Sequence, residues 1–289
     1  MSDMYCPVIR VDGLIGDEFR IYTELNENQL RHYFEPAEEG IFIAETANVI
    51  RRALDAGYQP ISLLVEEKYV GTEAEDIIER FSQIAEGEKC RIPVYVSSLG
   101  NMSKMTGYNL TRGVLAAFRR KQMSPVEEVC RDAHTIAVLE HVENPTNIGA
   151  IFRSAAAMGI DAVLISEGCA DPLQRRAIRV SVGTVFQIPW TRIPREVWPE
   201  DTVEWFHDHD FTLVSMALKN DTISIDDPRL RECSHIAICL GNEGFGLTDD
   251  TILMSDYTVK IPMREGVDSL NVAAASAVAF WEITRARAD

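Results

Sequence analysis

The sequence contains no apolar run of the roughly 18 residues that a membrane-spanning helix needs, so a transmembrane protein is excluded. Its first residues, Met1 to Cys6, provide neither the basic nor the apolar region of a secretory signal. The six cysteines are scattered, and no two of them form a C-x-x-C pair. This spacing disfavours a zinc ribbon or a disulfide framework and is typical of reduced thiols. We therefore expect a cytoplasmic protein with no membrane partner and no bound metal.

Basic residues are also scarce, with 28 Lys and Arg against 45 Asp and Glu and a net charge of −17. A protein that binds nucleic acid usually has a basic excess, because neutralised phosphates release counterions. An RNA partner therefore requires that the few basic residues cluster on one face. Each short basic cluster, taken alone, is more typical of a solvated helix face. These clusters lie at residues 51–52, 119–121, 175–179 and 192–195.

A length of 289 residues with 46% hydrophobic residues suits two modest domains. The polar stretch at residues 119–132 is the best boundary, and we predict an N-terminal α/β domain over residues 1–125 and a second domain over residues 133–289. Hydrophobic spacing in the first domain predicts alternating strands and helices. The predicted strands are residues 40–44, 61–66 and 92–96, and the predicted helices are residues 47–56, 73–85 and 109–120.

The second domain alternates more clearly. Strands are predicted at residues 135–139, 162–165, 185–188, 212–216, 236–240 and 257–261. Helices are predicted at residues 148–158, 173–180, 202–209, 249–254 and 271–287. Strands that are apolar on both faces and separated by helices indicate a parallel sheet covered on two sides, an α/β fold. Ligands of such sheets bind beyond the carboxyl ends of the strands, so the loops after Leu139, Leu240 and Ile261 are the candidate site.

The first of these loops runs from His141 into the helix that contains Arg153. Asn147 is a suitable N-cap for that helix, and Gly149 allows another backbone to approach its first turn. The segment from Asn144 to Asn147 has more polar residues than a strand-to-helix turn needs. An N-cap with a surface arginine is the plain structural interpretation, and a ligand site is the alternative.

The second loop, Gly241-Asn-Glu243-Gly-Phe-Gly246, has three glycines directly after a strand, which suggests a backbone close to a ligand. Its G-x-x-G-x-G order is the reverse of the dinucleotide fingerprint, and the next strand ends in Ile261-Pro262 rather than in an acidic residue. A nicotinamide-dependent oxidoreductase is therefore disfavoured. Glu243 would repel phosphates and suits a cationic or hydroxyl-bearing ligand.

The third loop extends from Ile261 to the last helix. Pro262 ends the strand, and Ser269 or Asn271 can cap the helix. That helix is rich in alanine and serine, so another element can approach it closely. A tight core helix explains these small residues whether or not the loop binds a ligand.

In this order, the three loops resemble the motifs of the SpoU (TrmH-type) branch of the SPOUT RNA methyltransferases. The matching motifs are N-P-x-N-I-G-x-I-x-R-S-A, L-G-N-E-G-x-G-L and I-P-M-x-x-x-x-x-S-L-N-V. The resemblance covers residues 135–287, and the N-terminal domain more weakly resembles a ribosomal-protein-like RNA-binding domain. It implies a parallel sheet with a deep trefoil knot, a homodimer, and a site near the subunit interface.

The resemblance implies methyl transfer from S-adenosylmethionine to a ribose 2′-hydroxyl of rRNA or tRNA, without a metal. By similarity, Arg153 fixes a phosphate and stabilises charge on the oxygen, Asn147 positions the ribose or Arg153, and Glu243 orients Arg153 or substrate groups. Asn271 and Ser269 hold the third loop. The implied cofactor-binding residues are Gly241, Ile261, Met263, Ser269 and Leu270.

Two alternative functions remain besides that of an oxidoreductase. A catalytically silent RNA-binding protein could keep the same fold, although Arg153 and all three motifs are present. A base methyltransferase of a related knotted branch would share the cofactor and differ in its product.

Overall fold

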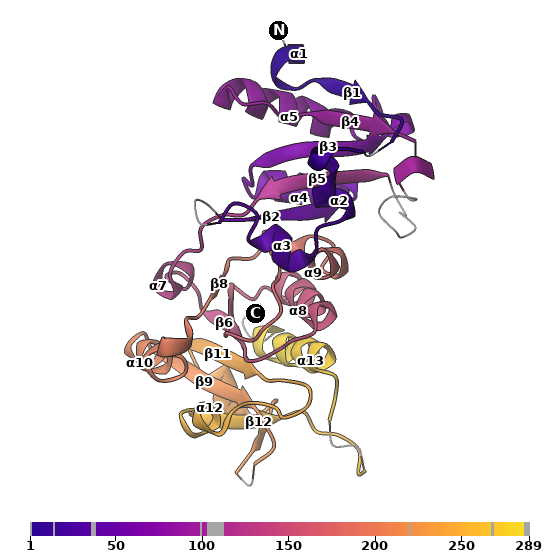
Figure 1. The fold of residues 1–289 in the computed structure, drawn as a ribbon. Helices are drawn as coiled ribbons and strands as arrows, with labels where there is room; N and C mark the ends of the chain where they lie inside the picture. The colour runs from indigo at the N-terminus through magenta and orange to yellow at the C-terminus, as the bar shows by residue number, and fades with distance from the viewer. Residues whose placement is uncertain are drawn as a thin grey trace. The chain divides into compact units, whose positions relative to one another are not determined.

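The computed structural model describes residues 2–13, 15–35, 39–98, 100–102, 113–219, 221–266 and 269–285. The chain forms two compact units (Figure 1). Unit 1 comprises Met1–Gln122 and Leu173–Gly183, and unit 2 comprises Met123–Pro172 and Thr184–Asp289. The chain therefore passes between the units three times. No helix within the described ranges is both long and apolar enough to cross a membrane.

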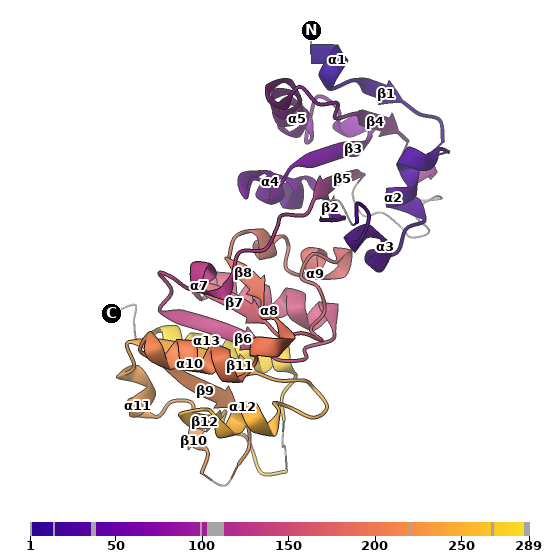
Figure 2. The same ribbon diagram turned by 60° about the vertical axis from the view of Figure 1, so that its left-hand side comes forward.

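Unit 1 is built on a five-stranded mixed sheet in the order β1-β4-β3-β5-β2. The strands are β1 (Val8–Arg10), β2 (Ile41–Glu45), β3 (Pro60–Glu66), β4 (Val94–Ser97) and β5 (Val114–Arg119). Figure 2 shows α4 (Ala47–Asp55) and α5 (Glu75–Glu88) on one side of this sheet, with α2 (Arg20–Thr23) and α3 (Glu27–Arg31) on the other. The short α1 (Ser2–Tyr5) precedes β1. Apolar side chains from α2, α3 and the sheet form a core that includes Tyr22, Leu64 and Tyr95.

The predicted helix at residues 109–120 is wrong over its described part. Val114–Arg119 is the strand β5, which pairs antiparallel with both β2 and β3. Five of its six residues are buried, since both faces of this strand are covered. A continuous apolar run has no period that separates a buried strand from a buried helix, which explains the error. Residues 109–112 lie outside the described residues.

The helix α9 (Arg175–Val180) belongs to unit 1, although its residues fall within the predicted second domain. Arg175 donates from Nη2 to the carbonyl oxygen of Ile21 at 2.8 Å. Arg52 donates from Nη1 to the carbonyl oxygen of Val182 at 2.6 Å. These hydrogen bonds satisfy backbone carbonyls at two places and hold the segment on unit 1.

Unit 2 contains a seven-stranded, fully parallel sheet in the order β10-β12-β9-β11-β6-β7-β8. Its strands are β6 (Thr135–Leu139), β7 (Ala162–Ile165), β8 (Trp190–Arg192), β9 (Phe211–Met216), β10 (Ile223–Ser224), β11 (His235–Leu240) and β12 (Tyr257–Lys260). All residues of β6 and β7 are buried, as expected for strands covered on two faces. This sheet confirms the predicted α/β fold class.

Helices cover both faces of this sheet. Figures 1 and 2 show α8 (Pro145–Ala157) and α13 (Val272–Arg285) on one face, and α10 (Glu200–Asp208) and α12 (Asp249–Leu253) on the other. The short helices α7 (Val126–Val129) and α11 (Pro228–Arg231) lie between strands in the sequence. The trefoil knot stays a prediction.

Two further predictions for unit 2 are corrected. Residues 185–188 are not extended, because Thr184–Phe186 forms a 3-10 turn and the strand begins at Trp190. The first helix begins at Pro145 rather than at Ile148, and its N-cap is Asn144, whose side chain accepts from the Thr146 amide at 2.8 Å. Pro145 fits the first helical turn because its missing amide hydrogen is not needed there. Asn147 therefore lies inside the helix, and its side chain is available for other contacts.

Candidate active site

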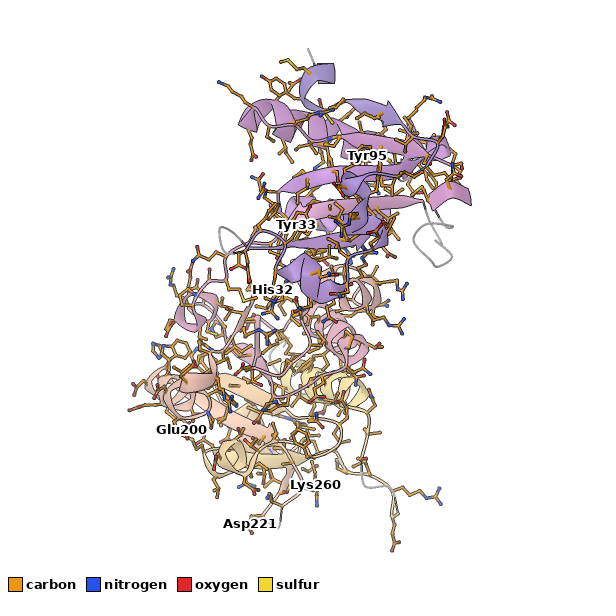
Figure 3. All side chains as sticks on the ribbon, viewed as in Figure 1. His32, Tyr33, Tyr95, Glu200, Asp221 and Lys260 are labelled. Atoms are coloured by element: carbon orange, nitrogen blue, oxygen red, sulfur yellow. The ribbon has the colours of Figure 1, made fainter. Side chains whose placement is uncertain are left out.

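The three loops selected from the sequence all follow parallel strands of unit 2, so they leave the sheet at the same edge. A cavity of about 510 Å³ lies there, between the ends of β9, β11 and β12. This volume is within the range of small-molecule sites, roughly 300–1,000 Å³. Lys260 of β12, which lines the cavity, is labelled in Figure 3. The lining includes all five predicted cofactor-binding residues, Gly241, Ile261, Met263, Ser269 and Leu270.

The loop after β11 folds back on itself. Asn242 and Gly246 exchange backbone hydrogen bonds of 3.1 and 3.0 Å. A Cβ atom at Gly241 would overlap the backbone of Gly246 and Leu247, so only glycine fits this position. The Asn242 side chain donates to the carbonyl oxygen of His141 at 2.9 Å, which ties this loop to the one after β6. The loop is therefore held in one shape by its own hydrogen bonds.

Three of the predicted catalytic residues form one hydrogen-bonded chain. The Asn147 amide donates to the Glu243 carboxylate and accepts from Asn271 Nδ2 at 3.2 Å. Asn147 is 8% exposed, whereas Glu243 and Asn271 reach the surface. Asn271 also accepts from the Ala273 amide at 3.0 Å and so caps α13. This chain joins the three loops at the rim of the cavity.

Arg153 does not take part in that chain. Its side chain is exposed on α8, and it forms no hydrogen bond or ion pair with any residue that the structure describes. A helix residue six positions beyond Asn147 is about two turns away and about 120° around the axis. The two side chains therefore leave α8 in different directions.

Glu140, the first residue after β6, is a site residue that the motifs do not predict. Its side chain is 1% exposed, and Oε1 accepts from Thr248 Oγ1 at 2.7 Å. Thr248 is the N-cap of α12, so this contact anchors the far end of the loop after β11. Burial, with a smaller contribution from the negative charge of Glu140, raises the pKa of the Cys239 thiol. An acidic residue directly after the apolar run at residues 136–139 is the signal that could have identified this position.

The cavity rim carries one exposed ion pair. Lys219 Nζ lies 2.9 Å from Asp249 Oδ1, and both residues line the cavity. The Lys219 ammonium lowers the pKa of the Asp249 carboxyl. Because both side chains are exposed, the pair adds little to stability.

Most of the basic clusters in the sequence have structural roles. Arg51 binds the Asp76 carboxylate with two hydrogen bonds of 2.7 and 2.8 Å. Arg120 is buried and donates to the carbonyl oxygen of Ile41 at 3.1 Å. These guanidinium groups are occupied within the protein, so the clusters contribute fewer cations to a ligand than their number suggests.

Comparison with known proteins agrees with this geometry. Residues 134–281 match the model of the SpoU rRNA Methylase family. An uncharacterized tRNA/rRNA methyltransferase of Mycobacterium bovis is 37% identical over 252 residues, which cover 86% of this chain and 83% of the relative. The chain belongs to the SpoU family.

Solved structures of other proteins share the fold across both units. An AdoMet-bound rRNA methyltransferase from Sinorhizobium meliloti matches with a TM-score of 0.77 at 21% identity, over 96% of this chain and 98% of that one. An RNA 2′-O ribose methyltransferase matches with a TM-score of 0.70 at 25% identity, over 97% of this chain and all of that one, 100%. The three sequence motifs therefore identified the family correctly, and this SpoU-family chain is an RNA methyltransferase.

Proposed function

We propose that this SpoU-family protein transfers a methyl group from S-adenosylmethionine to a ribose 2′-hydroxyl of rRNA or tRNA. One observation carries the proposal: the hydrogen-bonded chain Asn271–Asn147–Glu243 stands at the rim of a cavity of about 510 Å³. A site for methyl transfer to RNA needs a pocket for the donor and, beside it, polar groups that position a sugar. Relatives and structural neighbours named as RNA methyltransferases support the same reaction.

The lining of the cavity suits the donor. Leu240, Leu247 and Val259 provide apolar walls for an adenine ring, while the loops after β11 and β12 offer backbone groups for hydrogen bonds. Gly241, Ile261 and Leu270 would contact the donor, with Met263 and Ser269 beside them. When bound, S-adenosylmethionine supplies a methyl group on a sulfonium, which is already a strong electrophile.

The protein's own task is to prepare the nucleophile. A ribose hydroxyl is almost fully protonated at neutral pH, so its oxygen must be oriented and its developing negative charge stabilised. Asn147 would position the ribose, and Glu243, which accepts from Asn147 rather than from Arg153, would orient it through a hydrogen bond. The guanidinium of Arg153 stays charged at working pH and would fix an RNA phosphate beside the reacting oxygen.

We also propose that the protein works as a homodimer in the cytoplasm. The helix α13 exposes Ala274, Val278 and Trp281 at helical spacing, and the exposed fractions of Val278 and Trp281 are 41% and 57%. Such an apolar stripe favours contact with a second copy. Light scattering should give twice the monomer mass, and a monomeric mass would contradict the dimer.

The reaction is tested with tritium-labelled S-adenosylmethionine and RNA from cells that lack the protein. Label in alkali-resistant dinucleotides is the expected product, because a 2′-O-methyl group blocks cleavage at the adjacent linkage. Label in alkali-labile mononucleotides would indicate base methylation. Saturable donor binding without any transfer would favour a silent RNA-binding protein.

A further inference from the structure

Phe245 is a large apolar side chain that the fold holds in solvent. Its ring is 65% exposed, although it lies on a loop that lines the cavity. The amides of Gly244 and Phe245 donate to Asn242 Oδ1 at 2.7 and 3.3 Å. With the backbone pairing of Asn242 and Gly246, these bonds fix the loop. An exposed ring on a fixed loop loses little conformational freedom when it binds a partner.

Other exposed apolar side chains surround the same opening. Leu218 and Leu270 line the cavity and are 58% and 43% exposed. The His141 ring, whose residue follows the end of β6, lies 6.1 Å from the Phe245 ring between centroids. A group of exposed apolar side chains at the mouth of a cavity marks a binding surface more strongly than scattered ones do.

The charges around this surface disfavour an anionic partner. Unit 2 has 26 Asp and Glu against 11 Lys and Arg, which leaves a net charge of −15, and Glu243 lies two residues before Phe245. Phosphate groups are repelled by such surroundings, whereas a nucleobase is neutral and has a flat apolar face. Aromatic side chains bind unpaired bases by stacking, with little dependence on base identity.

We propose that Phe245 is the stacking platform for the base of the nucleotide that is methylated. This proposal rests on the proposed function, in which the Asn147–Glu243 pair positions the target ribose. The base is bonded to that ribose, so it must lie beside the pair, and Phe245 is the exposed ring of the Glu243 loop. The donor does not need this ring, since the interior of the cavity has its own apolar walls.

Four full-length variants test the platform with the same tritium assay and RNA. Phe245→Ala and Phe245→Leu remove the aromatic face, and Phe245→Trp keeps it. Leu253→Ala is the matched control, because Leu253 is 82% exposed on α12 and does not line the cavity. The half-saturating RNA concentration should rise about 5- to 100-fold in the Ala and Leu variants and stay near the wild-type value in the Trp and control variants.

Two further measurements identify the cause. Calorimetric binding of S-adenosylhomocysteine without RNA should be unchanged in Phe245→Ala, and a tenfold loss there would assign the ring to the donor and overturn the proposal. The defect in RNA binding should be independent of salt, since stacking releases no counterions. A wild-type half-saturating RNA concentration in Phe245→Leu would also overturn the proposal. So would a rise in Leu253→Ala equal to that in Phe245→Ala. If the wild type transfers no methyl group, the proposed function fails. Filter retention of the same RNA by these variants then still tests whether the Phe245 ring binds RNA.

Discussion

Unit 1 and unit 2 differ sharply in charge although they are similar in size. Unit 1 has 17 Lys and Arg against 19 Asp and Glu, a net charge of −2, whereas the net charge of unit 2 is −15. Long-range attraction of RNA depends on positive charge, and the net charge of unit 2 opposes it. From this difference we expect long-range attraction of RNA and methyl transfer to belong to different parts of the chain. We place the chemistry in unit 2, and unit 1 is the better candidate for holding most of the RNA backbone.

The largest effect is expected from Arg153, which we place in the chemistry of unit 2. Arg153→Ala should lower kcat by roughly 10²- to 10³-fold, because the positive charge that we place beside the reacting oxygen is lost. Donor binding should remain, since Arg153 does not line the cavity. Single-turnover rates with tritium-labelled donor measure the loss. Arg131→Ala, at another exposed arginine of unit 2, is the control, and wild-type turnover in the Arg153 variant would show that its assigned role is wrong.

Substitutions at two glycines, one in each unit, compare the roles of the units more directly. The backbone crowds both glycines. A Cβ atom at Gly241 would overlap Gly246 and Leu247, and one at Gly40 would overlap the carbonyls of Leu30 and Arg31. Gly241→Ala should weaken S-adenosylhomocysteine binding by at least about tenfold, because the loop must shift by an amount that costs roughly 1–3 kcal/mol. Gly40→Ala should destabilise unit 1 and leave that binding unchanged. Calorimetry measures the binding of S-adenosylhomocysteine, and urea denaturation measures stability. Equal loss of binding in both variants would show that the donor site does not depend on unit 2 alone.

A smaller effect is expected on the salt dependence of RNA binding. Arg179 in α9 of unit 1 and Arg131 in unit 2 are both exposed. If unit 1 holds the RNA backbone, Arg179→Glu should weaken RNA binding several-fold and reduce the slope of log K against log salt concentration by about 1. Arg131→Glu should leave that slope near the wild-type value. Filter binding between 50 and 200 mM salt, roughly the range over which the slope is resolved, gives both values. A larger change in the Arg131 variant would assign the phosphates to unit 2.

The smallest effect compares two ion pairs. Arg51 lowers the pKa of Asp76 in unit 1, so the pair's contribution to stability is present above the ordinary Asp value of 3.8 and is lost as pH falls below it. Asp76→Asn should cost about 0.5 kcal/mol at pH 7, at the low end because the carboxylate is half-exposed. This cost should vanish near pH 2–3, about one unit below the ordinary value. Asp249→Asn, which removes the more exposed pair of unit 2, should leave the urea midpoint unchanged at both pH values.

How well the strands and the site residues can be predicted depends on the pattern that each leaves in the sequence. The strands β6, β7, β9, β11 and β12 of unit 2 are predictable because short apolar runs alternate with periodic helices and glycine turns, whereas the short edge strands β8 and β10 carry no such signal. β5 was not, since a strand buried on both faces has the same composition as a buried helix. The sequence does not predict the contacts of Asn147, because a polar residue in a turn fits a cap equally well, and only the register of α8 shows that Asn144 fills that role. The role of Phe245 follows only from its exposure, which the sequence does not show.

The return of the chain into unit 1 at Leu173–Gly183 affects how the protein can be divided. A fragment that ends at Gln122 lacks Arg175, so the carbonyls of Ile21 and Tyr22 lose their donors. A fragment that starts at Met123 carries Ala177 and Ile178 without the surface that buries them. Truncation at the polar boundary should therefore give two fragments that are less stable than the intact chain and prone to aggregate. A single protease cut at the same place should instead leave two pieces that migrate together under native conditions, because α9 still anchors one piece to the other.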